Sequence, residues 1–422
     1  MSRIALFAAA AGVEFALAIV ASAHGEFAMP SQALIFVPLI LLAGFAFLFA
    51  VRFFENIPSA LHSRTLWGFA IALRLAMVTC APGDDFWRYA WEGRVQSAGE
   101  NPYLLSPSAP ELEPLRDKNW TRINHAEVAA IYPPATELTF AALTRVSSSP
   151  YWFKSVFIAA DLLALALLLR LVNPVRAAWY AWNPAVLYAF AGAAHYDSLV
   201  LLALTAAVLA LHRSDQSPAT RANWQLASVA CLSAAIAFKL VPAILLPVWA
   251  FALGKRAWLL ALCVLPAALA IPFGGIAITL QPLRDFADVS RFNELLVWIF
   301  PNPWQRNWPA NTLLCATVAA IVVRFRKDWP RSALWALGAT LVLSPVLHPW
   351  YATWILPLAI WRHQPAWTVL SISTLAALFL WETTPLWDAW HPNILTRALV
   401  LVPPLIAWRF HSAFRIPHSA LR

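Results

Sequence analysis

A succession of apolar runs, each about as long as a bilayer is thick, most strongly constrains how this chain can fold. A membrane-spanning helix needs roughly 20 mostly apolar residues, and shorter helices are tolerated inside a bundle. Hydrophobic residues make up 61% of the 422 residues and charged residues only 12%, whereas soluble domains carry about 25% charged residues. Together with a mean hydropathy of +0.63, these values exclude a water-soluble fold and place the chain in a lipid bilayer.

Several of the candidate spans are short, and two adjacent pairs are interrupted by proline, at Pro242 and Pro349. Proline removes a helical hydrogen bond, so we expect each of these pairs to be kinked or re-entrant. The sequence therefore predicts an all-α polytopic helix bundle of about 11–14 spans, with residues 1–422 forming one integral-membrane domain. The candidate runs are 4–23, 33–51, 66–80, 153–171, 178–193, 197–211, 224–238, 241–253, 257–272, 310–323, 332–347, 350–361, 366–381 and 396–409.

The first apolar run has some features of a cleavable signal sequence, namely Arg3 before it and Ala-Ser-Ala at 21–23. Glu14 inside the run, and the many spans that follow, favour an uncleaved first helix instead. In either case we expect His24 to emerge on the outer side of the membrane.

The distribution of Lys and Arg predicts the orientation, because short cytoplasmic loops are rich in these residues. With the N-terminus inside, the cytoplasmic segments hold 17 basic and 3 acidic residues, and the outer segments hold 11 basic and 16 acidic residues. The net charge of +9 is then an orientation signal, and we expect no nucleic-acid partner. The outer set includes residues 81–152, which we expect to form a large extracytoplasmic loop with an acidic motif and amphipathic helices.

That loop begins with two adjacent carboxylates, Asp84 and Asp85, where the chain leaves the third candidate span. Arg88 and Glu92 follow at helical spacing, so both signs of charge lie beside a hydrophobic boundary. A partly desolvated carboxylate here could act as a general base that takes a proton from an acceptor hydroxyl. The alternative is that one of the aspartates only caps the following helix.

Two further polar clusters lie at predicted outer ends of spans. His195 and Asp197 flank Tyr196 at the junction of two short spans, where they could orient a phosphate or a sugar, or could be packing groups. Lys239 precedes the break at Pro242, where a cation and freed backbone donors suit an anionic phosphate leaving group. The Lys239 side chain could instead snorkel to the membrane interface.

A last cluster surrounds His348, which lies between two apolar segments and is a candidate functional group. Trp350 and Tyr351 follow it and could pack on sugar rings. The alternative for these two aromatic residues is the interfacial aromatic belt of membrane proteins.

Motifs for soluble cofactors are absent from the sequence. Neither G-x-G-x-x-G after a strand nor G-K-[ST] occurs, so an enzyme here would use a donor that is already in the membrane. The four cysteines have no C-x-x-C spacing, and the His-x-Asp pair has no identifiable third ligand. We therefore expect neither a metal nor another cofactor.

In their order along the chain, these motifs resemble the multi-pass GT-C glycosyltransferases. In particular they resemble the polyprenyl-phosphate-mannose-dependent α-mannosyltransferases of bacterial envelopes, including the lipomannan-elongating family, and the related glycosyltransferase family 87. The resemblance covers about residues 81–360, and one departure is that the acidic loop follows the third span, whereas in this class it commonly follows the first. The matching residues are Asp84–Arg94, Gly99-x-Asn101-Pro102-Tyr103, Tyr132-Pro133-Pro134, His195-Tyr196-Asp197, Phe238–Pro242 and His348–Tyr351.

This resemblance implies a hexosyltransferase that moves a sugar, expected to be mannose, from a polyprenyl-phosphate donor to a glycan or glycolipid acceptor. It implies a multi-pass protein of the cell inner membrane with its active site on the extracytoplasmic, periplasmic side, generally inverting and without a metal. Asp84 or Asp85 would be the catalytic base. The expected ligands of the donor phosphate are Lys239, His348, His195 and Arg88, and the expected substrate-binding residues are Asp197, Glu92, Tyr132, Trp350 and Tyr351.

The alternative function is a transporter or flippase of lipid-linked sugars, in which the same polar groups would line a pathway. A pathway requires ionisable residues distributed through the membrane depth. Few charges of this chain lie within the candidate spans, and the candidate site residues gather at outer ends, which favours an enzyme. A third possibility is a degenerate family member that acts as a structural subunit.

Overall fold

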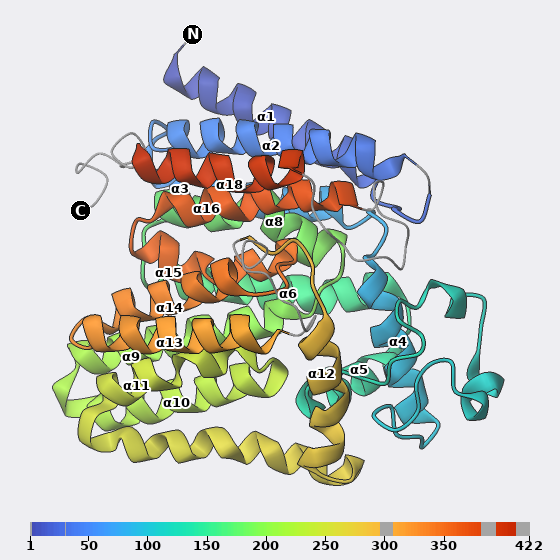
Figure 1. The fold of residues 1–422 in the computed structure, drawn as a ribbon. Helices are drawn as coiled ribbons and strands as arrows, with labels where there is room; N and C mark the ends of the chain where they lie inside the picture. The colour runs from blue at the N-terminus through green and yellow to red at the C-terminus, as the bar shows by residue number, and fades with distance from the viewer. Residues whose placement is uncertain (1, 30, 296–306, 381–393, 411–422) are drawn as a thin grey trace.

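The computed structural model describes residues 2–29, 31–295, 307–380 and 394–410. Within these ranges the fold is helical, and the isolated extended pairing is a parallel bridge between Phe292 and Val346. Most helices run side by side in one direction, while α4 (Asp84–Ser97) and α12 (Ile276–Val289) lie across that direction at one end (Figure 1). The architecture confirms the expected all-α membrane bundle.

Five helical segments of the described chain are long and apolar enough to cross a membrane. Two shorter apolar helices, α13 (Trp308–Arg324) and Pro365–Phe379, accompany them. The remaining candidate spans form shorter, more polar or interrupted helices, and the total of about 11–14 crossings stays a prediction. The five long segments are α1 (Arg3–Ser22), α2 (Gln32–Phe54), α6 (Pro150–Leu168), α9 (Asp197–Gln216) and the composite run Val241–Phe273.

Both proline-containing pairs of spans are broken, as the sequence predicts. The first break places Lys239 in extended backbone with φ −156° and ψ 136°, and the second places His348 at φ −74° and ψ 151°. Each polar residue therefore lies between helical pieces and not on a helix. The pieces are α10 (Arg221–Phe238), η5 (Val241–Leu245), α11 (Leu246–Leu253) and η6 (Gly254–Phe273) at the first break, and α14 (Trp329–Leu343), η8 (Pro349–Thr353) and α15 (Leu356–Trp361) at the second.

A buried ionic network ties three helices together in the bundle. Nε of Arg74, on α3 (Ser59–Met77), lies 2.5 Å from a carboxylate oxygen of Asp161 on α6. The hydroxyl of Tyr180 donates to the other oxygen of Asp161, and Arg74 also donates to the carbonyls of Ala70 and Ala181. Because apolar lipid gives helices little reason to associate, such buried polar contacts help to fix which helices are neighbours.

The expected large loop contains two packed helices, α4 and α5 (Pro134–Val146). They cross closely at Gly93, where an added Cβ would lie 2.5 Å from the carbonyl oxygen of Phe140. The connection between them is compact and holds the short helices η1 (Pro110–Leu115) and η2 (Trp120–Arg122). Other short or terminal pieces of the fold are α7 (Pro174–Ala181), α8 (Pro184–Val186), η3 (Leu187–Gly192), η4 (Pro218–Thr220), α16 (Pro365–Ser373), η9 (Thr374–Phe379) and α18 (Ile394–Arg409).

Candidate active site

The two adjacent aspartates begin helix α4. The N-cap residue is Gly83, so Asp84 and Asp85 occupy the first helical turn, where the macrodipole favours negative charge. The N–H of Gly83 donates to the carbonyl of Ala193 at 2.9 Å, and a Cβ at Gly83 would come within 3.3 Å of that residue. The missing side chain thus lets the start of α4 lie directly against the segment that carries His195.

A single side-chain amide holds both carboxylates. Nδ2 of Asn124 donates to Asp84 at 2.8 Å and to Asp85 at 3.0 Å. The other carboxylate oxygen of Asp85 lies 3.7 Å from Nδ1 of His195, and the hydroxyl of Tyr89 lies 3.4 Å from the same nitrogen. The Asp85 side chain is 23% exposed and that of His195 is 1% exposed, so a substrate can reach the carboxylate while the imidazole forms the wall behind it.

The surroundings of the two aspartates favour binding of a proton near neutral pH. Burial first, and then the negative charge of Asp85, raise the pKa of Asp84 to about 7. Burial also raises the pKa of Asp85, while the hydrogen bond from Asn124 and the positive charge of Lys239 oppose that rise. A carboxylate with such a raised pKa is a suitable general base at neutral pH, because it holds a transferred proton more readily than an exposed one.

Unusual backbone geometry directs His195 into the site. The preceding helix η3 is a π-helix, and Ala194 after it has a left-handed φ of 64°. The N–H of His195 donates to the carbonyl of Ala189 at 2.8 Å, and its ring stacks on Trp350 with 3.5 Å between ring centroids. Short π-helical segments and non-glycine residues with left-handed φ are both energetically unfavourable, and both are found more often at functional sites than elsewhere.

The Trp350 ring separates two histidines. His348 stacks on it with ring centroids 4.4 Å apart, and Phe292 covers the opposite side of His348 at 4.4 Å. Burial above all, with the charge of Lys239, lowers the pKa of His195 well below its usual range, and burial and Lys239 lower the pKa of His348 to about 3. Both imidazoles are therefore neutral at physiological pH and can interact with a substrate by hydrogen bonds but not by charge.

The ammonium of Lys239 is surrounded by one carboxylate and several aromatic rings. Its Nζ lies 2.8 Å from Oδ1 of Asp197, and the indole of Trp354 donates to the same oxygen at 2.8 Å. The ammonium also lies 4.4 Å from the ring centroid of Tyr351 and 5.2 Å from that of Tyr196. The cation is 14% exposed while Asp197 is 1% exposed, so a buried anchor aims a partly accessible positive charge into the site.

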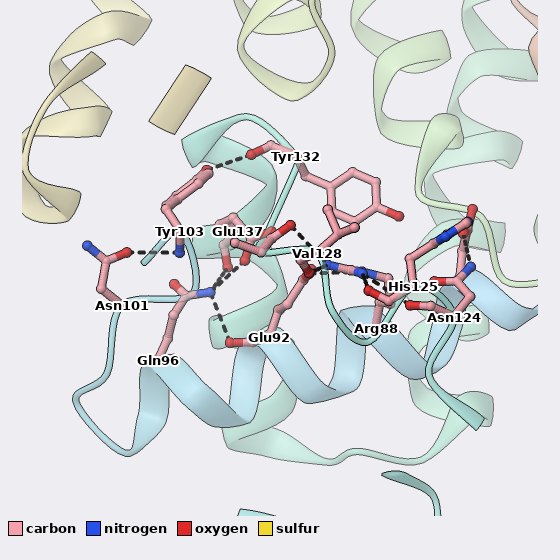
Figure 2. Close-up of polar contacts among 12 residues, drawn as sticks. Arg88, Glu92, Gln96, Asn101, Tyr103, Asn124, His125, Val128, Tyr132 and Glu137 are labelled. Atoms are coloured by element: carbon pink, nitrogen blue, oxygen red, sulfur yellow. Dashed lines mark hydrogen bonds and ion pairs between the residues drawn. The ribbon is translucent and has the colours of Figure 1, made fainter. Parts of the chain in front are cut away.

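Tyr132 packs against two other tyrosines of the site, one near His195 and one near Lys239. Its ring lies 5.4 Å from Tyr89 and 5.5 Å from Tyr196, in edge-to-face geometry. The hydroxyl of Tyr103 donates to the carbonyl of Tyr132 at 2.5 Å and so fixes the backbone there (Figure 2). Nearby, the hydroxyl of Thr136 donates to the Phe238 carbonyl at 2.6 Å, which attaches the loop helix α5 to the break that carries Lys239.

Arg88 and Glu92 lie on α4 but turn toward the loop. They form a buried ion pair at 2.8 Å, and Arg88 also donates to backbone carbonyls within residues 124–129 (Figure 2). The structure therefore brings Asp84, Asp85, His195 and Lys239 to one region and directs Arg88 and Glu92 away from it. Sequence reasoning missed Asn124, Tyr89 and Trp354, which contact the predicted residues.

A metal ion in a protein needs a close group of ligating side chains. Within the described part of the chain, no three His, Cys, Asp or Glu side chains are grouped closely enough to hold an ion. The groups near Asp85 include the Asn124 amide, the His195 imidazole and the neighbouring Asp84 carboxylate, and the charge of Lys239 acts on it.

Comparison with known proteins decides the family. The model of the α-(1→6)-mannopyranosyltransferase family, described as its N-terminal domain, matches residues 4–255 of the 422. The chain belongs to this family. The resemblance drawn from the motifs is confirmed, and the protein is an α-mannosyltransferase that uses a sugar donor and a glycan acceptor. No curated protein and no solved structure matches the chain.

The matched region of this mannosyltransferase contains most of the candidate site. Asp84, Asp85, His195 and Lys239 all lie within it. The aromatic segment 348–351 lies beyond residue 255, yet its rings stack on His195 and surround Lys239. The family-defining part of the chain and its C-terminal part thus meet at the same site, and membership of a mannosyltransferase family argues against the transporter alternative.

Proposed function

We propose that this mannosyltransferase transfers mannose from a polyprenyl-phosphate donor to a glycan or glycolipid acceptor, with Asp85 as the general base. The observation that carries the proposal is the environment of Asp85: an accessible carboxylate, held by Asn124, lies beside His195 and within the field of Lys239. A base and a cation in one region are what displacement of a phosphate by a hydroxyl requires. The lack of a nucleotide-binding glycine loop supports a lipid-linked donor.

In the proposed reaction the acceptor oxygen attacks the anomeric carbon of the donor sugar as its proton passes to Asp85. The bond between that carbon and the phosphate oxygen breaks, and the electron pair leaves with the phosphate. Lys239 would stabilise the negative charge that develops on the leaving phosphate. A cation that is already in position, in a site with little water, does so without the free-energy cost of rearranging during the reaction. Asp84 stays hydrogen-bonded to Asn124 and tunes the basicity of its neighbour.

The remaining candidate residues are assigned by their positions. His195 and His348 would donate hydrogen bonds to the donor as neutral imidazoles, because their lowered pKa values remove their charge. The exposed parts of Tyr351 and Tyr132 offer ring edges and hydroxyls for a sugar. Trp350, which is covered by the two histidine rings, would act on the substrate by positioning them. Asp197 acts on the substrate through Lys239, which it anchors.

The extracytoplasmic side of the cell inner membrane is the proposed location of the site, in a multi-pass protein. The support is the excess of basic residues in the loops assigned to the cytoplasm and the acidic character of loop 81–152. Loop helices α4 and α5 lie at one end of the bundle (Figure 1), and the hydrogen bond from Thr136 on α5 to the Phe238 carbonyl attaches the Lys239 break to them, which fits a site at one membrane face.

The test is transfer by purified enzyme in lipid with labelled polyprenyl-phosphate-mannose and the glucose and arabinose analogues alongside. The proposal expects mannose on the acceptor and an equal amount of free polyprenyl phosphate. A flippase would relocate the donor without releasing the phosphate. The proposal fails if Asp85→Asn transfers mannose at the wild-type rate or if no polyprenyl-phosphate sugar is consumed.

A further inference from the structure

Every guanidinium N–H group of Arg88 donates to an acceptor of the protein itself. Nε and Nη2 donate to the Glu92 carboxylate at 3.1 and 2.8 Å, and Nη1 donates to the carbonyls of Asn124 and His125 at 3.1 and 2.9 Å. Nη2 also donates to the carbonyls of residues 128 and 129 (Figure 2). Arginine has five N–H donors in a fixed fork, so none is left for a donor phosphate.

The segment 124–129 that Arg88 holds carries the amide that bridges the two aspartates. His125 in this segment has a left-handed φ of 46°, a conformation that residues with a Cβ adopt rarely. Such a turn persists only when its surroundings hold it. Arg88 contacts four carbonyls on both sides of this turn, and the side chain of Asn124 extends from it toward Asp84 and Asp85.

We propose that Arg88 and Asn124 form a positioning relay for the catalytic carboxylates. Arg88 fixes the 124–129 segment, and the segment presents the Asn124 amide so that Asp85 is held ionised and facing His195. Glu92 belongs to the same relay because its carboxylate orients the Arg88 fork. This inference rests on the proposed function and deepens it: neither Arg88 nor Glu92 touches the substrate, although the sequence pattern predicts that both do.

The relay and a phosphate-binding role make opposite demands on residue 88. A phosphate ligand needs positive charge, which lysine supplies. To hold the 124–129 segment, residue 88 must donate to four of its carbonyls while it is oriented by the Glu92 carboxylate. This requires the planar guanidinium fork, which lysine lacks. Arg88→Lys therefore distinguishes the two roles without removing the charge.

The experiment measures kcat, the KM for polyprenyl-phosphate-mannose and the pH profile of kcat/KM for the full-length enzyme in lipid. The variants are Asn124→Ala, Arg88→Lys and the double variant. Arg94→Gln is the matched control, because Arg94 also lies on α4 and donates to a loop carbonyl, that of Leu115, which is outside 124–129. Thermal unfolding of each variant in detergent identifies any that do not fold.

Loss of the two amide donors raises the pKa of the aspartate pair, so Asn124→Ala moves the acid limb of the profile to higher pH by about one unit. Arg88→Lys moves it in the same direction, lowers kcat and leaves the donor KM within about twofold, while the control matches wild type. The double variant equals Asn124→Ala alone, because both residues act through one contact.

The relay is overturned if Arg88→Lys keeps the wild-type profile and kcat, if Arg88 variants change only the donor KM, or if the two single effects are independent. If Arg88→Lys does not fold, Asn124→Ala decides, and an unshifted acid limb overturns the relay. Failure of the proposed function looks different, because then Asp85→Asn itself would keep full activity.

Discussion

The ammonium of Lys239 lies 2.8 Å from the carboxylate of Asp197. Lys239 is at the break that follows α10, and Asp197 is in the first turn of α9. The same carboxylate oxygen accepts a hydrogen bond from Trp354. A cation on non-helical backbone is thereby fixed by two other parts of the chain. Its position depends on tertiary contacts, since the local sequence around the break supplies none of them.

Lys239→Met is expected to lower kcat by about 100-fold or more, in the range found when a transition-state charge stabiliser is removed. Lys239→Arg should retain more activity because it keeps the charge in the same surroundings. The measurement is single-turnover transfer of labelled mannose at saturating donor. Lys255→Met, at an exposed cation, is the control and should match wild type. A Lys239→Met enzyme within threefold of wild type would show that the leaving phosphate is stabilised elsewhere.

The two aspartates are expected to be unequal. Asn124 donates to both carboxylates, and Asp85 also lies 3.7 Å from Nδ1 of His195. Asp85→Asn should lower kcat by about 10²–10⁴-fold, the usual contribution of a general base, and Asp84→Asn by only about tenfold. Asp117→Asn, in an exposed ion pair with Arg94 of the same loop, serves as the control. The reverse order of the two losses would assign the base to Asp84.

Activity is expected to fall as the pH decreases through about 7, because burial and the charge of Asp85 raise the pKa of Asp84 to about 7 and protonation of Asp84 makes Asp85 beside it a weaker base. Protonation of that carboxyl changes the charge beside Asp85. Because the pKa values of His195 and His348 are lowered, neither imidazole titrates between pH 6 and 8. We therefore expect no second change of activity with pH in that range.

Asp84→Asn should move this limb to lower pH, because removal of a neighbouring like charge lowers the pKa of the remaining carboxyl. A profile of kcat/KM for wild type and variant between pH 5 and 9 checks the prediction. A limb that stays in place after the substitution would assign it to a group outside the aspartate pair.

The fold class and the breaks between helices could be predicted from the sequence better than the contacts of the candidate site residues. Apolar runs and prolines reveal spans and breaks, so the non-helical positions of Lys239 and His348 followed from local pattern. The spacing of Arg88 and Glu92 likewise predicted that both lie on one helix, where the structure pairs them. In each case the cause lies within a few neighbouring residues.

Contacts between distant residues could not be predicted in this way. Asn124 is a single asparagine in a polar loop, and it has meaning only because folding places it beside Asp84 and Asp85, about 40 positions earlier. The direction of Arg88 depends on a left-handed turn at His125 that no local signal marks. Such long-range hydrogen bonds decide whether a charged residue contacts substrate or only supports one that does.

Substitutions in the buried network of α3 and α6 are expected to affect stability more than chemistry. Arg74→Met leaves Asp161 charged and buried without its cation, which in soluble proteins costs about 3–5 kcal/mol. The apparent unfolding temperature in detergent should fall, while kcat per folded molecule stays near wild type. Arg52→Met breaks an exposed pair with Glu55 and is the matched control, with little expected change. An unchanged unfolding temperature for Arg74→Met would show that the network contributes no net stability.

Gly93→Ala is expected to disturb the loop that carries the aspartates. Its Cβ would lie 2.5 Å from the carbonyl oxygen of Phe140 and would also clash with the Thr144 hydroxyl, so α4 must move away from α5. Because a backbone carbonyl cannot rotate out of the way like a flexible side chain, the shift reaches the first turn of α4. Displacement of a base by about 1 Å can cost about 100-fold in rate, so kcat should fall even in folded enzyme.

Gly68→Ala is the matched control for this substitution, because Gly68 is also helical and a Cβ there meets nothing within 4 Å. Replacement of a helical glycine by alanine at such an open position should stabilise by about 0.5–1 kcal/mol. Transfer rates and unfolding temperatures of the two variants, measured side by side, separate close packing at Gly93 from the general effect of alanine. Wild-type activity in Gly93→Ala would mean that α4 can shift without moving Asp85 relative to His195.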